Sequence, residues 1–261
     1  MSLATTNTTV LNLITGAKNV GVYNFGKLIF GGGLYYPLMI TLLFLVTSVA
    51  LKTIVGLAFA TFFNSNHIRF RGALIALMLV PWALPSMLSI LIWKGMFSTG
   101  FGAINQILGT IGVPAVNWLG NATNAFITYN IVEVWLAYPF MMTVILAAMR
   151  SISPELHESA MIDGAGSLSR LRHVTLPLIK KPLSFAIVGT SLVSFMAFAV
   201  PFLLNEGGPA RANEFLMVYG YREAFSMGRY GYAAAFMILV FIILIALTVI
   251  LVKVTKLVKE E

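Results

Sequence analysis

The stretch GYAAAFMILVFIILIALTVILV, residues 231–252, decides the fold class of this chain, because it contains no charged side chain from end to end. A helix needs about 20 consecutive apolar residues to cross the roughly 30 Å of hydrocarbon in a bilayer. Backbone groups in that layer meet no water, so a spanning segment must satisfy its own hydrogen bonds, as a helix does. Residues 231–252 therefore predict a membrane-spanning helix.

Four more apolar stretches of similar length precede it, at residues 37–63, 72–97, 125–149 and 182–204. Transmembrane strands would instead read as segments of about 10 residues with alternating hydrophobicity, and the sequence has no such pattern. We therefore expect an all-α integral membrane protein with five visible transmembrane helices.

The composition of the chain supports this class. Of its 261 residues, 59% are hydrophobic and 10% are charged, whereas soluble domains carry about 25% charged residues. A mean hydropathy of +0.89 excludes an ordinary soluble enzyme and a disordered chain. The net charge of +8 does not indicate nucleic-acid binding, because excess Lys and Arg in a membrane protein usually mark its cytoplasmic loops.

The distribution of Lys and Arg predicts the orientation. If the loop at residues 150–181 is cytoplasmic, ten basic residues lie inside, namely Arg69, Arg71, Arg150, Arg170, Arg172, Lys180, Lys181, Lys253, Lys256 and Lys259. Five then lie outside, namely Lys18, Lys27, Arg211, Arg222 and Arg229. The positive-inside rule thus predicts a multi-pass protein of the cell membrane with a cytoplasmic C-terminus.

This orientation places residues 1–36 outside as an external N-terminal segment. The segment lacks the charged start and the apolar run of a signal peptide. We expect that a membrane helix preceding it is missing from this sequence, and insertion of the first span as a reverse anchor is the alternative. Residues 37–261 then form one transmembrane domain, with a cytoplasmic loop at 150–181.

Two patterns for bound groups are incomplete. Residues 21–27, GVYNFGK, have the glycine and lysine spacing of a phosphate-binding loop, but Leu28 stands where that motif needs Ser or Thr to hold magnesium. His157 and Glu158 have no further metal ligands at suitable spacing, and the chain has no cysteine. We expect no cofactor and no metal in this chain.

Prolines and lysines interrupt the predicted spans. Pro81 and Pro85 each remove a helix hydrogen bond and force a kink, which serves either helix packing or the opening of a translocation path. Lys52 and Lys94 also lie within apolar stretches. We expect both ammonium groups to extend to the nearer membrane interface.

Glu133 lies about eight residues inside the span at 125–149, and at a rise of about 1.5 Å per residue this is roughly 12 Å deep. An ionisable group there costs several kcal/mol unless it is paired or hydrated. One interpretation is a hydrated substrate path, formed by the helical face of Asn130, Glu133, Ala137 and Phe140 with the nearby Trp135 and Tyr138. The other is a structural glutamate paired with a Lys or Arg of a neighbouring helix. Ser191 and Ser194 are weaker path candidates, because such serines often bond to their own backbone.

The most specific signal is SPELHESAMIDGAGSLSRLRHVTLPLIKKPL, residues 153–183. Ser153 at the N-cap, Pro154 at the first helical position and Glu155 in the first turn favour a helix start. Gly164 and Gly166 are expected to end this helix, and a second helical stretch is expected to run until Pro177 breaks it. The small residues Ala160 and Ala165 would let the segment fit closely into a groove on a partner.

This segment resembles the coupling loop of ABC importer permeases. The resemblance is carried by Glu158-Ser159-Ala160, by Asp163-Gly164-Ala165 and, eleven residues beyond Ala165, by Leu176-Pro177. Ser159 replaces the family's Ala, and Leu171 stands where Phe or Ile is usual. Residues 84–108 and 203–235 are similar to the carbohydrate branch of the family, the latter to the maltose type and to the subunit that pairs with a second, different permease.

The resemblance implies a type I permease-like helical bundle that works by alternating access. It implies that two ATPase subunits bind the cytoplasmic coupling helix around Glu155 and the motif residues, and that they alone bind ATP. It further implies a second permease, an external solute-binding protein and a sugar substrate. Two alternatives remain: an ABC permease for an amino acid, polyamine or phosphate, and an ion-coupled transporter, which would show paired intramembrane charges or an inverted repeat.

Overall fold

The computed structural model describes residues 3–9, 16–65 and 68–255, and almost all of its regular structure there is helical. Four helical segments in this part of the chain are long and apolar enough to cross a membrane. They are α2 (Tyr35–Asn64), α7 (Ala122–Arg150), α14 (Tyr230–Thr255) and the run Lys180–Asn205, which comprises α11 (Lys180–Phe195) and α12 (Ala199–Asn205). These four segments correspond to four of the five predicted apolar stretches.

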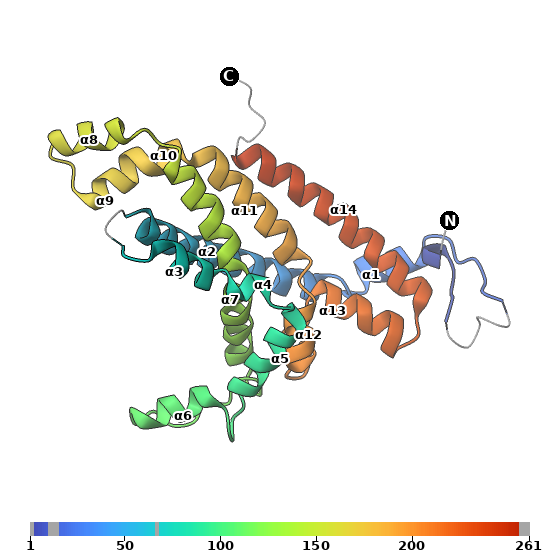
Figure 1. The fold of residues 1–261 in the computed structure, drawn as a ribbon. Coiled ribbons are helices and arrows are strands. Elements are labelled where there is room, and N and C mark those ends of the chain that lie inside the picture. The colour runs from blue at the N-terminus through green and yellow to red at the C-terminus, as the bar shows by residue number, and fades with distance from the viewer. Residues whose placement is uncertain (1–2, 10–15, 66–67, 256–261) are drawn as a thin grey trace.

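Shorter helices connect them (Figure 1). In chain order they are η1 (Leu3–Thr5), α1 (Tyr23–Phe30), α3 (Arg71–Met78), α4 (Val80–Ala83), α5 (Ser86–Met96), α6 (Ala103–Thr110), α8 (Pro154–Ile162), α9 (Ser167–Arg170), the π-helical turn η2 (Leu171–Thr175), α10 (Leu176–Leu178), α13 (Leu216–Tyr221) and a second π-helical turn η3 (Arg222–Ser226).

The apolar stretch at residues 72–97 does not form one continuous helix, which corrects the expectation of a single helix there. It is divided into α3, α4 and α5, and α5, its longest part, is shorter than a full span. Leu84 precedes Pro85 with φ −79° and ψ 145°, because the proline ring disfavours helical backbone in the residue before it. The number of times this stretch crosses the membrane stays a prediction.

A second interruption separates α11 from α12. Pro201 lies in the first turn of α12, and in a continuous helix its ring would clash with the carbonyl of Ala197, four residues earlier. The backbone leaves the helical path between Phe195 and Ala199. The resulting bend places Phe198 and its neighbours beside the central helices rather than in line with α11.

The centre of the molecule is the packing of α2 against α7, the most extensive contact between any two helices in the described residues. Gly56 makes this close approach possible. A Cβ atom at Gly56 would lie 2.6 Å from Met141 Cβ and 3.0 Å from the backbone nitrogen of Met142. Membrane helices commonly use small residues in this way, because association there depends on close packing.

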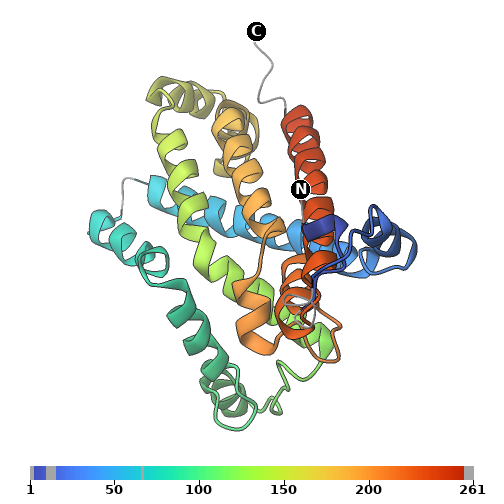
Figure 2. The same cartoon turned by 90° about the vertical axis from the view of Figure 1, so that its right-hand side faces the viewer.

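The two ends of the bundle differ (Figures 1 and 2). Both views place α8 and α9 at one end of the molecule and α6 at the other. Near the end with α6, two buried carboxylates pair with arginines. Glu214, in the loop after α12, is paired with Arg211 at 2.6 Å and also with Arg222, and Glu223, in η3, is paired with Arg229 at 2.6 Å. Burial raises the pKa of Glu223, and Arg229 opposes that shift.

Candidate translocation cavity and coupling segment

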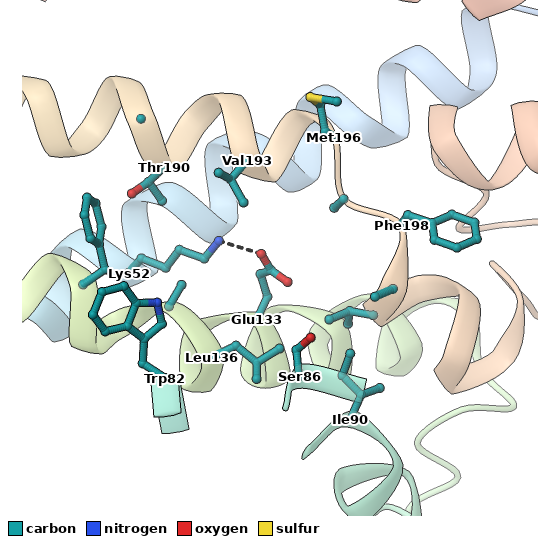
Figure 3. Close-up of a pocket in the computed structure, with 16 residues that line it drawn as sticks. Lys52, Trp82, Ser86, Ile90, Glu133, Leu136, Thr190, Val193, Met196 and Phe198 are labelled. Carbon is teal, nitrogen blue, oxygen red and sulfur yellow. Dashed lines mark hydrogen bonds and ion pairs between the residues drawn. The ribbon is translucent and has the colours of Figure 1, made fainter. Parts of the chain in front are cut away.

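A cavity of about 630 Å³ opens between α2, α4, α5, α7, α11 and the start of α12 (Figure 3). Its walls are mostly apolar, with hydroxyl groups and one pair of charges. The lining residues are Lys52, Trp82, Ser86, Ile90, Glu133, Leu136, Ala137, Phe140, Gly189, Thr190, Val193, Met196, Ala197, Phe198, Ala199 and Val200. An apolar cavity with a few convergent polar groups is the usual form of a small-molecule site.

The pair of charges is Lys52 and Glu133. Lys52 Nζ lies 2.9 Å from Glu133 Oε1 and also donates to Ser194 Oγ at 2.9 Å. The Lys52 side chain is completely buried, and that of Glu133 is 12% exposed. One polar cluster thus joins α2, α7 and α11 in the interior of the bundle.

Both interpretations of Glu133 describe part of this geometry. Its pairing with a lysine of a neighbouring helix is the arrangement expected of a structural glutamate. Glu133 also lines the cavity together with Ala137 and Phe140, three of the four residues assigned to one helical face. Its role in transport stays a prediction.

The other five predicted path residues lie outside the cavity lining. Asn130 donates to Phe126 O within α7 and accepts from Thr47 of α2. The remaining side-chain bonds are from Trp135 to Ser89, from Tyr138 to Met78 O, from Ser191 to Ile187 O and from Lys52 to Ser194. Ser191 bonds to its own helix, as expected for a serine in a membrane helix.

The expectation that Lys52 reaches the membrane interface is wrong. Its ammonium finds two partners within the bundle, and this is less costly than leaving a charge unpaired in an apolar layer. Lys94, in contrast, is exposed and donates to Leu203 O at 2.8 Å. The position of Lys52 near the middle of a span is the sequence signal for a buried, paired ammonium group. Its partner Glu133 lies 81 residues further along the chain, so no local pattern identifies the pair.

Several other lining residues were not predicted from the sequence. Trp82 and Ser86 enter the cavity because the stretch at 72–97 is broken near Pro81 and Pro85, and Phe198 enters because the chain bends between α11 and α12. Pro81 and Pro85 each directly precede one of these lining residues. Whether the kink serves packing or a path stays a prediction.

The predicted coupling segment begins with α8, which starts at Pro154 after Ser153 as expected, although the Ser153 side chain makes no cap bond. Gly164 has φ +81° and follows the C-cap residue Asp163. Ala165 N donates to Ala160 O at 2.9 Å, and Gly164 N donates to Met161 O at 3.0 Å. These two bonds define a Schellman motif, which needs a left-handed residue where Gly164 stands.

The surface of this segment is open. None of the residues of α8 is buried, and Glu155, Glu158, Ser159 and Asp163 are all exposed. Apolar side chains are exposed beside them: Leu156 is 47%, Met161 50%, Ile162 87% and Leu168 77% accessible. Exposed apolar groups rimmed by acids are typical of a surface that binds a protein partner.

The base of the segment, in contrast, is anchored. Leu171, Leu176 and Ile179 pack against the ends of α2 and α7, with Ile145 and Met149 in the same cluster. The second helical stretch runs through η2 and α10 and ends at Leu178, one residue beyond Pro177, before α11 begins at Lys180. A π-helical turn interrupts the regular ladder of bonds, which accommodates a residue without an N–H.

A family model described as the inner membrane component of binding-protein-dependent transport systems matches residues 52–256. The chain belongs to this family. The matched region contains the cavity residues and the whole coupling segment. Together with several apolar helices, membership makes the chain a multi-pass membrane protein and a transport permease subunit.

The permease is similar to two curated maltose-type proteins. It is 34% identical over 237 residues to the trehalose/maltose transport system permease protein MalF of Thermococcus litoralis, covering 91% of this chain and 80% of that protein. It is 32% identical over 251 residues to the maltose/maltodextrin transport system permease protein MalF of Escherichia coli, covering 90% of this chain and 49% of that protein. The chain thus spans about half the length of the latter relative.

Solved structures share the fold. A bacterial ABC transporter that imports the acidic polysaccharide alginate matches with a TM-score of 0.80 at 22% identity, over 92% of this chain and 85% of that one. A methionine ABC transporter matches with a TM-score of 0.63 at 15% identity. The importer-permease fold is therefore confirmed. The ion-coupled alternative required paired intramembrane charges, and Lys52–Glu133 is such a pair, but membership of this family does not favour that alternative.

Proposed function

We propose that this chain is one of two different permease subunits in an ATP-driven, binding-protein-dependent importer of a sugar. The observation that carries the proposal is the exposed surface of α8 in a chain of this transport family. The turn at Gly164 ends this helix, and the residues that follow it pack against α2 and α7. The names of the two maltose-type relatives support a mono- or oligosaccharide as the substrate.

In this proposal residues 150–181 and the C-terminus are cytoplasmic, and residues 1–36 lie outside. Two ATPase subunits hold α8 in a surface groove, with the exposed apolar side chains in the groove and Glu155, Glu158 and Asp163 at its rim. The ATPases bind and hydrolyse the ATP. The permease contributes the translocation path and the segment that transmits the movement of the ATPases to it. Because Leu176 and Ile179 connect the segment to α2 and α7, a rotation of α8 would move the helices that line the cavity.

An external solute-binding protein would deliver the sugar to the end of the bundle that carries α6. The sugar would then pass through the cavity, where Glu133, Ser86 and Thr190 offer polar atoms among aromatic and aliphatic walls. Sugars suit such a site, because their hydroxyl groups need acceptors and donors while their ring faces pack on apolar side chains. The alginate importer has a solved complex with a periplasmic protein that carries an alginate pentasaccharide, and a similar delivery is inferred for this chain.

Purification of the complex from its native membranes tests the proposal. The permease, tagged at one end, is extracted in mild detergent, and the proteins that elute with it are identified by mass spectrometry. We expect an ATP-binding cassette subunit and a second permease of different sequence. Recovery of the permease as a complex without any ATPase would contradict the proposal.

A further inference from the structure

Lys52 and Glu133 form a buried ion pair whose presence packing alone does not explain. Replacing such a pair by apolar residues of similar volume is often neutral or stabilising in proteins, because desolvation of two charges offsets their attraction. Ionisable groups inside a membrane bundle more often mark the path of a solute. The location of the pair agrees with a role of this kind, because both residues line the cavity.

The pair also fixes the charge of the cavity. Among the 16 lining residues drawn in Figure 3, Lys52 and Glu133 are the charged ones. With Nζ and Oε1 only 2.9 Å apart, the two opposite charges compensate each other. The cavity is therefore polar at one point but has no net charge.

We propose that the Lys52–Glu133 pair makes this cavity selective for uncharged sugars and that Lys52 acts as the counter-charge that sets this selectivity. The inference rests on the proposed function and adds the charge class of the substrate. A solute with a carboxylate would lose its hydration in the cavity without gaining an opposite charge, because Lys52 is already paired with Glu133. A solute with an ammonium group would meet a carboxylate whose charge Lys52 already balances. A neutral sugar loses only hydroxyl hydration, and its hydroxyl groups can donate to Glu133.

The geometry identifies the atom that meets the sugar. Glu133 Oε1 accepts from Lys52, and Figure 3 shows the second carboxylate oxygen directed away from the lysine. Lys52 is itself completely buried and is also bonded to Ser194. Glu133 thus presents an acceptor to the cavity, while Lys52 remains behind it and balances its charge.

The test measures equilibrium binding of two probes to the whole purified complex. The probes are maltose and the same disaccharide with one hydroxymethyl group oxidised to a carboxylate. The Glu133→Gln variant leaves Lys52 as the charged residue of the cavity lining and should shift the ratio of the two affinities toward the carboxylate probe by about tenfold or more, the size expected for unit charges a few ångströms apart in a partly screened site. The Lys52→Met variant should shift it in the opposite direction.

The double variant Lys52→Met with Glu133→Gln separates selectivity from structure. It has no cavity charge, so the preference for maltose should return to that of the parent, whereas a purely structural pair predicts that stability changes and that the ratio of the two affinities stays at the parent's value in all three variants. Glu223→Gln is the matched control, because it neutralises a buried, arginine-paired glutamate outside the cavity lining. It should leave the ratio unchanged.

Two failures are distinguishable. If the parent complex binds neither probe, maltose is not its substrate and the proposed sugar class is in question. If the parent binds maltose but both single variants keep its affinity ratio, or if the double variant does not recover the preference, the proposed role of the ion pair is wrong.

Discussion

At the scale of single residues, Gly164 has the most demanding backbone conformation in the coupling segment. Its φ of +81° is one that residues with side chains rarely adopt, although a Cβ there would meet nothing within 4 Å. Valine at this position should cost about 1–3 kcal/mol in local strain and open the Schellman turn. We expect the Gly164→Val permease to insert normally and to lose ATP-driven uptake.

Gly166 provides the matched control for that change. A Cβ there would also meet nothing within 4 Å, but the φ of Gly166 is −67° with ψ 168°, a region that valine favours. Gly166→Val should therefore retain most of the uptake that Gly164→Val loses. Equal uptake by both variants, measured in vesicles with the membrane level of each protein determined, would show that the turn at Gly164 has no part in coupling.

Glu158 and Ser159 test the surface of α8 rather than its backbone. Both are exposed, so neither substitution disturbs packing within the permease. Glu158→Lys reverses a charge at the rim of the proposed contact and should lower the recovery of the ATPase with the purified permease several-fold, since charge at an interface rim governs partner association. Ser159→Ala should leave recovery close to that of the parent, and a similar loss in both variants would argue against a charge effect.

At the scale of elements, the contact of α2 with α7 depends on Gly56. A Cβ at this position would lie 2.6 Å from Met141 Cβ, so Gly56→Ala should force the two helices apart and cost about 1–3 kcal/mol, as overpacking usually does. Thermal unfolding of the purified permease, followed by size-exclusion chromatography after heating, measures the loss. Gly95→Ala is the control, because a Cβ in that part of α5 meets nothing within 4 Å and should leave stability unchanged or slightly raised; the same melting temperature in both variants would refute the packing argument.

The elements also show where sequence reasoning succeeds. The long apolar stretches predict α2, α7 and α14 because a hydrophobic run of that length has one stable form in a bilayer. The turn at Gly164 follows from local chemistry, and the structure has the bonds that a left-handed glycine makes possible. For residues 72–97 the sequence predicts only a kink, whereas the structure has three separate helices. How far two prolines divide a helix depends on the helices packed around it, which the local sequence does not indicate.

The candidate site was less accessible to sequence reasoning because its contacts are tertiary. Glu133 was identified from its depth, but its partner Lys52 is 81 residues away in sequence, and no local spacing indicates such a pair. Asn130 shares a helical face with Glu133, yet its amide oxygen accepts from Thr47 of α2 and its amide nitrogen donates to Phe126 O of its own helix. Pro177 predicts the end of a helix close to where α10 ends, but no local pattern indicates the π-helical turn η2 before it.

At the scale of the whole molecule, the orientation can be tested by chemical labelling. The chain has no native cysteine, so single cysteines report without background. Thr110 in α6 and Ser167 in α9 are both exposed and lie at opposite ends of the bundle. We expect a membrane-impermeant maleimide to label Thr110→Cys in intact cells and Ser167→Cys only after lysis, and the reverse pattern would invert the proposed topology.

The measurement that tests the central claim most directly is uptake of labelled maltose or trehalose by right-side-out proteoliposomes that contain the purified complex. The solute-binding protein is added outside, and the vesicles contain either ATP or ADP. The account predicts uptake only with ATP inside and only with the binding protein present. Uptake with ADP inside, driven by an imposed proton or sodium gradient, would contradict it.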